Sequence, residues 1–541
     1  RAEWGGGLQF LMACIATSVG LGNVWRFPFT AYENGGGAFL IPYIIVLIFV
    51  GKPFYFLEAL LGQFTNRSCA KTWGMVPAMK GLGYGQAFAA FCVVTYYCSL
   101  MGLTLYYLVA SFQSELPWSY CREEWSASLL TIYNDTFRSS AELYFRKIVL
   151  NEYESIENGI GTPSWQLTIC LFVSWATIFC VLCRGIKSTG KAVYFLAIFP
   201  YVIMTGLLIR SVTLEGAVNG ILFLVTPDWD KLWQPNVWYA AITQCFFSLS
   251  VCFGPILTYS SYNNFQHGVS RDVLIVTTLD TFTSLIAGCT IFGILGNLAH
   301  ELGNADISKQ DPEMILLFIS FYGIGSSVNN EVINLNKSSS ADLYFRFNIK
   351  VDKKKKILFV IFLNPTIRND ISTVVRAGTG LAFISYPEAL AKFTVVPQLF
   401  AVLFFLMLFV LGIGTTVAFT AVISSVIKDR FPSFQDWKVA GGVSCAGFLI
   451  GIVYCTRGGQ YILNLVDYFG GTFIIVFLAS FEVIAISWIY AGIDNFLDDT
   501  EFMVGSRPSI YWRFCWCFLT PLTLFSILIY FLIDLSPIKY N

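Results

Sequence analysis

Charged residues and histidines are scarce in this chain. Of its 541 residues, 13% are charged and 56% are hydrophobic, with a mean hydropathy of +0.64. A soluble domain carries about 25% charged residues, so this composition excludes an ordinary soluble domain and indicates a membrane protein. The two histidines, His267 and His300, fall in separate predicted loops, and no metal-binding or nucleophilic constellation is evident. An enzyme is therefore not supported.

The cysteines and the net charge give no sign of two further classes, a disulfide-rich protein and a nucleic-acid-binding protein. Fifteen cysteines in so apolar a chain are expected to pack between helices and do not indicate a disulfide framework. Cys121 alone lies in a predicted extracellular loop, where it has no partner. The net charge of zero gives no indication of nucleic-acid binding.

Apolar stretches long enough to cross a bilayer recur along the whole chain. About 20 residues suffice for a helix to do so. Eleven spans are predicted, at 8–29, 39–63, 87–112, 166–183, 191–210, 238–260, 273–299, 398–427, 438–455, 463–491 and 512–534. The fold class is therefore an all-α polytopic membrane protein.

The loops between the spans alternate in charge. The loops 64–86 and 184–191 carry lysine and arginine without acids, whereas the loop 113–165 is rich in acids. By the positive-inside rule the first two loops are cytoplasmic and the third is extracellular, which places the N-terminus in the cytoplasm. The sequon at Asn134 then becomes a candidate glycosylation site.

Two spans contain helix-breaking residues beside oxygen-bearing side chains. Residues 18–23 read SVGLGN in span one, and residues 250–255 read SVCFGP in span six. Two matched interruptions five spans apart point to an inverted repeat with a binding site at mid-membrane. Unwinding at Gly20 and Gly22 would free carbonyls that can hold a hard cation and N–H groups that can hold a carboxylate. The alternative is a kink that serves packing alone.

Ionisable residues in or near the spans require partners. Arg26 at the outer end of span one has Asp467 as a candidate partner, and Arg1 has Asp429 on the inside. Asp280 lies deep in span seven. A carboxyl group at that depth is costly and by default functional, as a cation ligand or as a protonated packing acid.

One internal segment and the end of the chain are anomalous. Residues 304–372 interrupt the span pattern, and their apolar runs are too short to cross a membrane. The segment is interpreted either as a large extracellular insertion or, as we favour, as translated intron, because its residues are those of A/T-rich codons. An odd number of spans would leave the C-terminus outside.

Several motifs make the chain resemble a known family. The stretches GLGNVWRFP and ENGGGAFLIPY resemble the neurotransmitter:sodium symporter family, and VGKPFYFLEALLGQF, AFISYPEA and DYFGGTF look most like its insect nutrient amino acid transporters. The resemblance implies a bacterial leucine-transporter-like fold, with broken helices one and six. Its two inverted five-helix repeats would be 1–210 and 238–491, followed by helix eleven at 512–534, with helix twelve absent.

The resemblance also implies specific sites. The first sodium site would consist of Ser18, Asn23, Ser248 and Asp280, and the second of Ala16, Val19, Leu411, Gly414 and Thr415. Substrate would contact Gly20, Leu21, Gly22, Val93, Tyr97, Phe247, Ser250, Phe253 and Phe419, with Tyr97 and the Leu21 and Gly22 amides at its carboxylate. Chloride would lie among Tyr43, Gln244, Ser248 and Ser284. The outer gate would be Arg26 and Asp467, capped by Tyr97 and Phe253; the inner gate would be Arg1 and Asp429, supported by Tyr262.

Particular residues narrow the expected function. Gly20 stands where monoamine carriers have an aspartate, which favours an α-amino acid, and Val93 with the phenylalanines favours a neutral side chain. Asp280 replaces the usual asparagine, which adds charge to the first sodium site and would broaden cation choice to K⁺ or make transport pH-sensitive. Gly414 lacks the oxygen that many relatives supply to the second sodium site.

We therefore expect a sodium-coupled symporter of neutral L-amino acids in the plasma membrane, working by alternating access, with K⁺ and Cl⁻ as further candidate ions and no organic cofactor. One alternative is a non-transporting or defective family member, motivated by the 304–372 segment and the missing twelfth span. Another is a carrier of a different amine-type solute, which Gly20 disfavours. The oligomeric state is not predicted.

Overall fold

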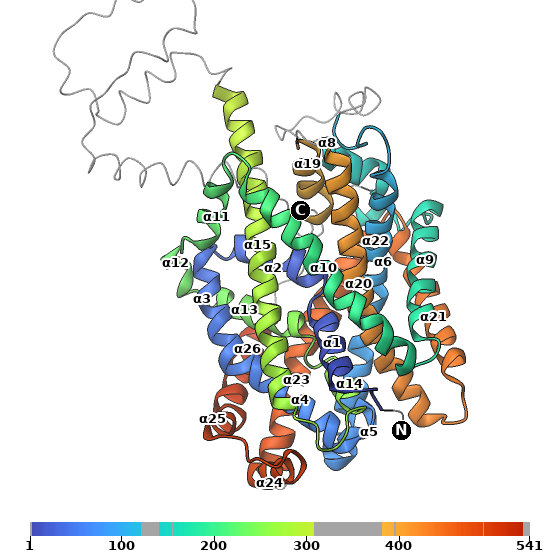
Figure 1. Ribbon diagram of the computed structural model, residues 1–541, viewed down its shortest axis with the longest axis vertical. Helices are drawn as coiled ribbons and strands as arrows, with labels where there is room; N and C mark the ends of the chain where they lie inside the picture. Colours follow the sequence, from blue (N-terminus) through green and yellow to red (C-terminus); the bar gives the residue numbers. More distant parts are fainter. Residues whose placement is uncertain are drawn as a thin grey trace, which may run out of the picture.

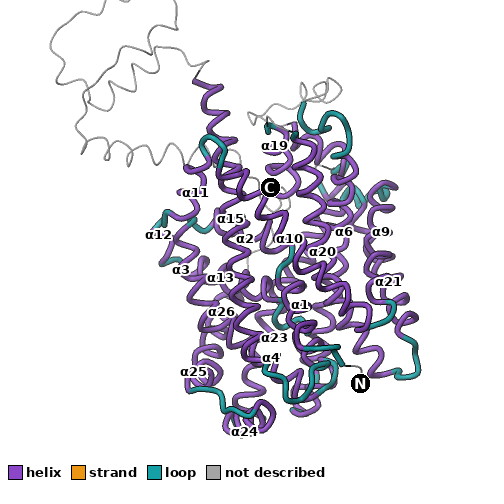
Figure 2. Tube along the Cα trace, viewed as in Figure 1, coloured by secondary structure: helices purple, strands orange, loops and turns teal. Residues whose placement is uncertain are grey.

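The computed structural model describes residues 3–120, 140–153, 155–307, 381–393, 396–490 and 492–533, with residues 301–307 and 381 described by their backbone alone. Within these ranges the regular structure is helical, and extended pairing is limited to two isolated bridges. Figure 2 shows that loops and turns lie mainly at the two ends of the helical bundle. The predicted all-α class is confirmed.

Nine helices in the described part of the chain are long and apolar enough to cross a membrane. They are Gly37–Thr65, Pro77–Ala110, Trp165–Leu182, Ile186–Val212, Val269–His300, Pro397–Arg430, Asp436–Cys455, Gly459–Ile489 and Ile510–Ile533. Each coincides with one predicted span. A helix satisfies its backbone groups internally, which is why apolar stretches of this length adopt it in hydrocarbon.

Three of these spans combine α-helix with π-helical turns, whereas the others are more regular. The combined spans are α3 (Gly37–Val46), η2 (Leu47–Gly51) and α4 (Lys52–Thr65); α22 (Gly459–Val466), η11 (Asp467–Phe473), α23 (Ile474–Ile484) and η12 (Ala485–Ile489); and α25 (Ile510–Phe514), η13 (Cys515–Leu519) and α26 (Thr520–Ile533). The others are α6 (Gly81–Ala110), α9 (Trp165–Leu182), α10 (Ile186–Val212), α15 (Val269–Ile307), α20 (Pro397–Arg430) and α21 (Asp436–Gly451) with η10 (Ile452–Cys455). Such turns are frequent at functional sites, and η11 carries Asp467.

The first predicted span is a broken helix. α1 (Gly7–Ser18) ends before Gly20, and the chain resumes as the π turn η1 (Gly22–Arg26) and α2 (Phe27–Glu33), bent by 41° from α1. Pro28 follows η1 directly, and the Val24 carbonyl that its missing N–H cannot serve accepts the Tyr386 hydroxyl at 2.9 Å.

The sixth predicted span is broken as well. α13 (Pro235–Leu249) and α14 (Pro255–Ser260) are separated by residues 250–254. Ser250, Cys252 and Gly254 adopt φ angles of 56°, 65° and 89°. This left-handed backbone cannot continue a right-handed helix, and Pro255 begins the second half. The eleven predicted spans are thus nine continuous helices and these two broken ones.

Short helices cover the two ends of the bundle (Figure 1). α5 (Cys69–Thr72) and α24 (Ile493–Val504) lie at the lower end, and α8 (Ser140–Leu143), α11 (Ala217–Val225) and α19 (Tyr386–Ala391) lie toward the upper end. The helix α5 of the basic loop 64–86 and the helix α8 of the acidic loop 113–165 therefore lie at opposite ends of the bundle. The remaining short elements are α12 (Trp229–Leu232), η3 (Trp73–Met75), η4 (Pro77–Met79), η6 (Tyr144–Val149), η7 (Ile156–Asn158) and η9 (Leu381–Ser385).

Close helix packing surrounds the two breaks. α6 packs along α20 and α9, and α1 packs against α10 and α20. α11 approaches α15 so closely that a Cβ at Gly220 would lie 1.7 Å from the Phe292 carbonyl oxygen. Small residues permit such backbone contact between membrane helices. The breaks in helices one and six are consequently enclosed by protein, where an unwound backbone can find partners.

Candidate functional site

The break in helix one is held by side chains rather than by helical hydrogen bonds. The Gly20 N–H donates to Asn23 Oδ1 at 3.0 Å, and the Leu21 N–H donates to the Tyr97 hydroxyl at 2.9 Å. A Cβ at Gly20 would lie 2.5 Å from Thr415 Oγ1 and 3.0 Å from the Tyr97 hydroxyl. Glycine is therefore required here by close packing against α6 and α20.

Asn23 joins the two broken helices to α15. Its Nδ2 lies 2.7 Å from Asp280 Oδ1 and 2.9 Å from the hydroxyls of both Ser248 and Ser284. The Ser248 hydroxyl also donates to Asp280 Oδ1, at 2.8 Å. All four side chains are buried. An amide has two N–H groups, so it cannot serve three acceptors equally. The cluster is therefore richer in oxygen than in donors, as a cation site requires.

Several buried oxygen atoms around this cluster lack a hydrogen bond within the described part of the chain. They are Ser18 Oγ, Asp280 Oδ2, the Tyr43 hydroxyl and Gln244 Oε1. Burying polar groups without partners costs free energy, so these atoms fit ligands that the protein binds. The free Asp280 oxygen suits Na⁺, and the Tyr43 hydroxyl, close to Ser248 and Ser284, suits an anion.

The residues expected at the second sodium site lie where α1 meets α20. A Cβ at Gly414 would lie 2.3 Å from the Ala16 carbonyl oxygen, so a side chain at this position has no room. The Thr415 hydroxyl donates to the Thr17 carbonyl at 3.2 Å. Val19 and Leu411 are buried beside them. The side-chain oxygen at this junction therefore comes from Thr415.

A small pocket of about 10 Å³ lies between the two breaks. Of the predicted substrate residues, it is lined by Gly20, Gly22, Tyr97, Phe247, Ser250 and Phe419. Leu21, Val93 and Phe253 are buried but lie outside this lining. Thr17 and Thr415 also line the pocket but were not predicted to do so. Their hydroxyl groups could have suggested Thr17, which lies beside the break in helix one, and Thr415, which was already expected at the second sodium site. Because the pocket holds about one water molecule, it must open to admit a larger ligand.

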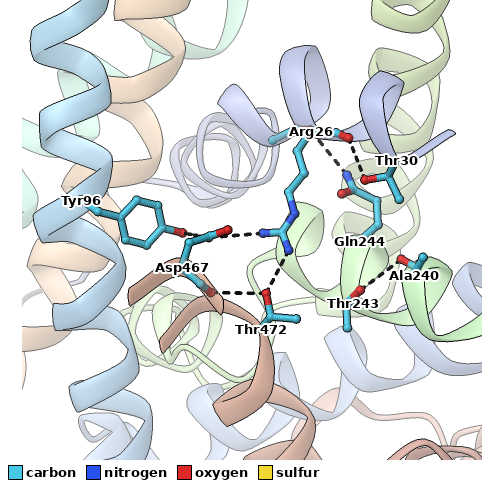
Figure 3. A network of polar contacts seen from close by, with 9 residues as sticks. Arg26, Thr30, Tyr96, Ala240, Thr243, Gln244, Asp467 and Thr472 are labelled. Atoms are coloured by element: carbon cyan, nitrogen blue, oxygen red, sulfur yellow. Dashed lines mark hydrogen bonds and ion pairs between the residues drawn. The ribbon is translucent and has the colours of Figure 1, made fainter. Parts of the chain in front are cut away.

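Arg26 and Asp467 meet at one end of this pocket (Figure 3). Arg26 Nη1 lies 3.6 Å from Asp467 Oδ1, and Arg26 Nη2 donates to Thr472 Oγ1 at 3.0 Å. The Tyr96 hydroxyl donates to Asp467 Oδ1 at 2.6 Å. Sequence reasoning identified the pair but missed Tyr96 and Thr472, which orient it.

The aromatic cap over the pocket differs from the one expected. The Arg26 guanidinium lies 4.2 Å from the centre of the Phe247 ring, a cation–π contact. Phe253, the expected cap, packs edge-on against Phe419, with ring centres 5.1 Å apart. Tyr97, the other expected cap, instead accepts the Leu21 N–H. In this conformation Phe247, and not Phe253, faces Arg26; both phenylalanines flank the same break, and their spacing does not determine which ring faces Arg26.

A larger cavity of about 360 Å³ lies toward the predicted cytoplasmic side, and it shares no lining residue with the pocket. Its lining includes Tyr259, Tyr262, Lys428, Asp429 and Asp436. Asp429 Oδ2 accepts the Ser68 N–H at 3.0 Å, and the Lys71 ammonium donates to the Asp429 carbonyl at 2.6 Å. Ser68 and Lys71 thus hold Asp429 at this cavity.

Several predictions fall outside the described residues. They are the inner-gate residue Arg1, the candidate glycosylation site Asn134 and most of the 304–372 segment. The partner proposed for Arg1, Asp429, is described and lies at the cavity with Tyr262. These three expectations remain predictions.

Comparisons with known proteins agree with this architecture. The sodium:neurotransmitter symporter family matches residues 1–541. Proteins called sodium-dependent nutrient amino acid transporter 1 are 50% identical in Drosophila virilis and 51% in Drosophila mojavensis, each over 100% of this chain and 78% of the relative. The Drosophila melanogaster protein of that name is 50% identical, over 100% of this chain and 79% of its own length. This family consists of transporters, in agreement with the expectation that the chain is not an enzyme. The chain belongs to the sodium:neurotransmitter symporter family.

Proposed function

We propose that the chain is a sodium-coupled symporter of neutral L-amino acids in the plasma membrane, with its N-terminus in the cytoplasm. The observation that carries this proposal is the meeting of both broken helices at Asn23, Ser248 and Asp280. Such an oxygen-rich junction between half-helices is where a coupled ion and an anionic substrate group can bind together. The names of the relatives support both an amino acid substrate and sodium dependence.

The substrate carboxylate would bind at the break in helix one. The Leu21 N–H now donates to the neutral Tyr97 hydroxyl, which can rotate to donate to a carboxylate instead. The half-helix beginning at Gly22 adds a favourable dipole for a negative group. Phe247 and Phe419 line the pocket, Phe253 packs edge-on against both rings, and the lining within the described part of the chain contains no charged side chain, which favours a neutral substrate.

Asp280 would determine the choice of ions at the first cation site. A carboxylate attracts any small cation more strongly than an amide does, so K⁺ can substitute for Na⁺ here. It also alters the proposed chloride site, because the Ser248 hydroxyl is directed at Asp280 and not at an anion. We therefore propose that transport depends weakly on chloride.

Alternating access would involve the two ends of the pocket. The Arg26–Asp467 pair closes one end, and the 360 Å³ cavity lies toward the predicted cytoplasmic side. For the pocket to open on the side of Arg26, the contacts of Arg26 with Asp467, Thr472 and Phe247 must break. Ion and substrate binding would then shift the populations of these states. The repeats would be residues 1–210 and 238–491, and Asn134 in the loop 113–165 would be glycosylated.

Radiolabelled uptake tests this proposal. Cells expressing the chain are given a panel of neutral, acidic, basic and amine solutes, while Na⁺, K⁺ and Cl⁻ are replaced in turn. We expect uptake of neutral amino acids that requires Na⁺ or K⁺ and persists without Cl⁻. If the chain reaches the cell surface and no solute accumulates, it is a non-transporting member of the family.

The variant Asp280→Asn tests the role of the carboxylate. We expect the K⁺-driven fraction of uptake to fall about tenfold relative to the Na⁺-driven fraction, which corresponds to about 1.4 kcal/mol. Chloride dependence should increase at the same time. Asp272→Asn is the matched control, because Asp272 is also a buried aspartate on α15 but pairs with His267 at 2.6 Å. An unchanged ion profile in Asp280→Asn would refute this role.

A further inference from the structure

A second buried cluster lies behind the break in helix six, outside the proposed ion sites. It comprises Glu58 on α4, Cys252 in the interrupted segment and Glu482 on α23. One carboxylate oxygen from each glutamate and the Cys252 sulfur all lie within 4.8 Å of one another. All three side chains have exposed fractions of 0%. The cluster joins three elements that are distant in sequence.

The hydrogen bonds of this cluster leave it with surplus acceptors. Both oxygens of Glu58 lie 3.2 Å from the Cys252 N–H, which can serve only one of them well. Glu482 Oε2 accepts Gln86 Nε2 at 2.8 Å, and the Glu482 carboxyl also faces the Cys252 thiol. Two carboxylates so close together in a low-dielectric interior repel each other unless a proton or a cation lies between them.

The donor set indicates which cation fits. A thiolate with two carboxylates is a ligand set that suits zinc-like ions, which bind sulfur and oxygen in tetrahedral sites. Mg²⁺ and Ca²⁺ prefer oxygen ligands alone. Three protein ligands leave a fourth position for water.

We propose that Glu58, Cys252 and Glu482 form a binding site for a thiophilic divalent cation of the zinc class. A cation held there joins the segment 250–254 to α4 and α23. Helix six then cannot move independently of its neighbours, so the bound cation inhibits transport. This inhibitory effect rests on the proposed function, whereas the binding itself does not.

Cadmium is the probe, because it is a soft divalent cation that binds thiolates tightly. Uptake is measured after Cd²⁺ is added during turnover, since the buried site requires motion for the ion to enter. We expect Cd²⁺ to inhibit the unmodified chain and Cys252→Gly to need at least about tenfold more Cd²⁺ for the same inhibition. Glu482→Gln should show a shift in the same direction. Equal concentrations of Mg²⁺ should not inhibit.

Cys69→Ala is the matched control thiol. Cys69 is fully buried beside the same break, where its Sγ lies 3.3 Å from the position of a Cβ at Gly254. It should leave the Cd²⁺ response unchanged. If Cys69→Ala removes inhibition and Cys252→Gly does not, the proposed site is wrong.

Direct binding separates this proposal from the proposed function. X-ray absorption at the cadmium edge of the purified full chain should show one sulfur ligand and several oxygen ligands, and Cys252→Gly should lose the sulfur. That result supports the site even in a chain that transports nothing. A spectrum with oxygen ligands alone in the unmodified chain would overturn the proposal.

Discussion

The two broken helices satisfy their free backbone groups in different ways. At the break in helix one, the partners of the Gly20 and Leu21 N–H groups are an amide oxygen and a phenol hydroxyl, both neutral. At the break in helix six, the partner of the Cys252 N–H is a carboxylate, Glu58. A neutral partner is displaced by a charged ligand far more easily than a carboxylate is.

The difference assigns separate roles to the two breaks. The first can exchange its own side chains for a substrate carboxylate, because Tyr97 is able to donate as well as accept. The second is held by a buried acid and, in this conformation, presents Ser248 and Phe247 to the pocket. Sequence similarity between the two stretches therefore does not imply similar chemistry. Three substitutions test this division.

The largest effect is expected from Glu58→Ala. It removes the acceptor of the Cys252 N–H and leaves a buried donor unsatisfied, which costs about 1–3 kcal/mol of the free energy of unfolding. We expect a loss of uptake of about 100-fold, because the wall of the pocket loses its support and errors in site geometry of about 1 Å can have effects of this size. Uptake is normalised to surface protein. Glu58→Gln keeps an acceptor and should retain more activity. Equal activity of the two variants would mean that the hydrogen bond does not hold the break.

A smaller effect is expected from Tyr97→Phe. It removes the hydroxyl that contacts Leu21 without removing the ring. A hydrogen bond to a charged group contributes about 1.5–3 kcal/mol, so we expect the KM for substrate to rise about tenfold or more. Tyr96→Phe is the control, because its hydroxyl contacts Asp467 instead. If Tyr96→Phe raises KM and Tyr97→Phe does not, the substrate carboxylate binds elsewhere.

The arrangement of spans could be predicted from the sequence because hydropathy and span length are local properties. Both breaks were also visible, since glycine and proline interrupt helices wherever they occur in the chain. Neighbouring residues were harder to assign. Tyr96 and Tyr97 point to Asp467 and Leu21 respectively, and no periodicity determines which of two adjacent tyrosines faces which partner.

The second acidic cluster was not predicted at all. Glu58 and Glu482 each lie inside a predicted span, where an ionisable residue is by default functional, so a signal was available. Their proximity depends on how α4 and α23 pack, and a single sequence does not contain that information. Asp280 was identified because it is an ionisable residue inside a predicted span, and the same argument applies to Glu58. Asp280 was singled out because it also departs from the asparagine that is usual in the family.

The smallest effect is expected from Cys252→Gly. Cys252 has a φ angle of 65°, a left-handed conformation that glycine adopts without steric cost. We expect the substitution to raise the free energy of unfolding by less than about 1 kcal/mol, since relief of strain is partly offset by the greater entropy of the unfolded chain. The thermal unfolding midpoint of the purified chain measures it. Cys245→Gly is the control, because Cys245 lies within the helix α13 and should lose stability. A loss of stability in Cys252→Gly as large as that of Cys245→Gly would mean that the thiol packing, and not the backbone, dominates at the second break.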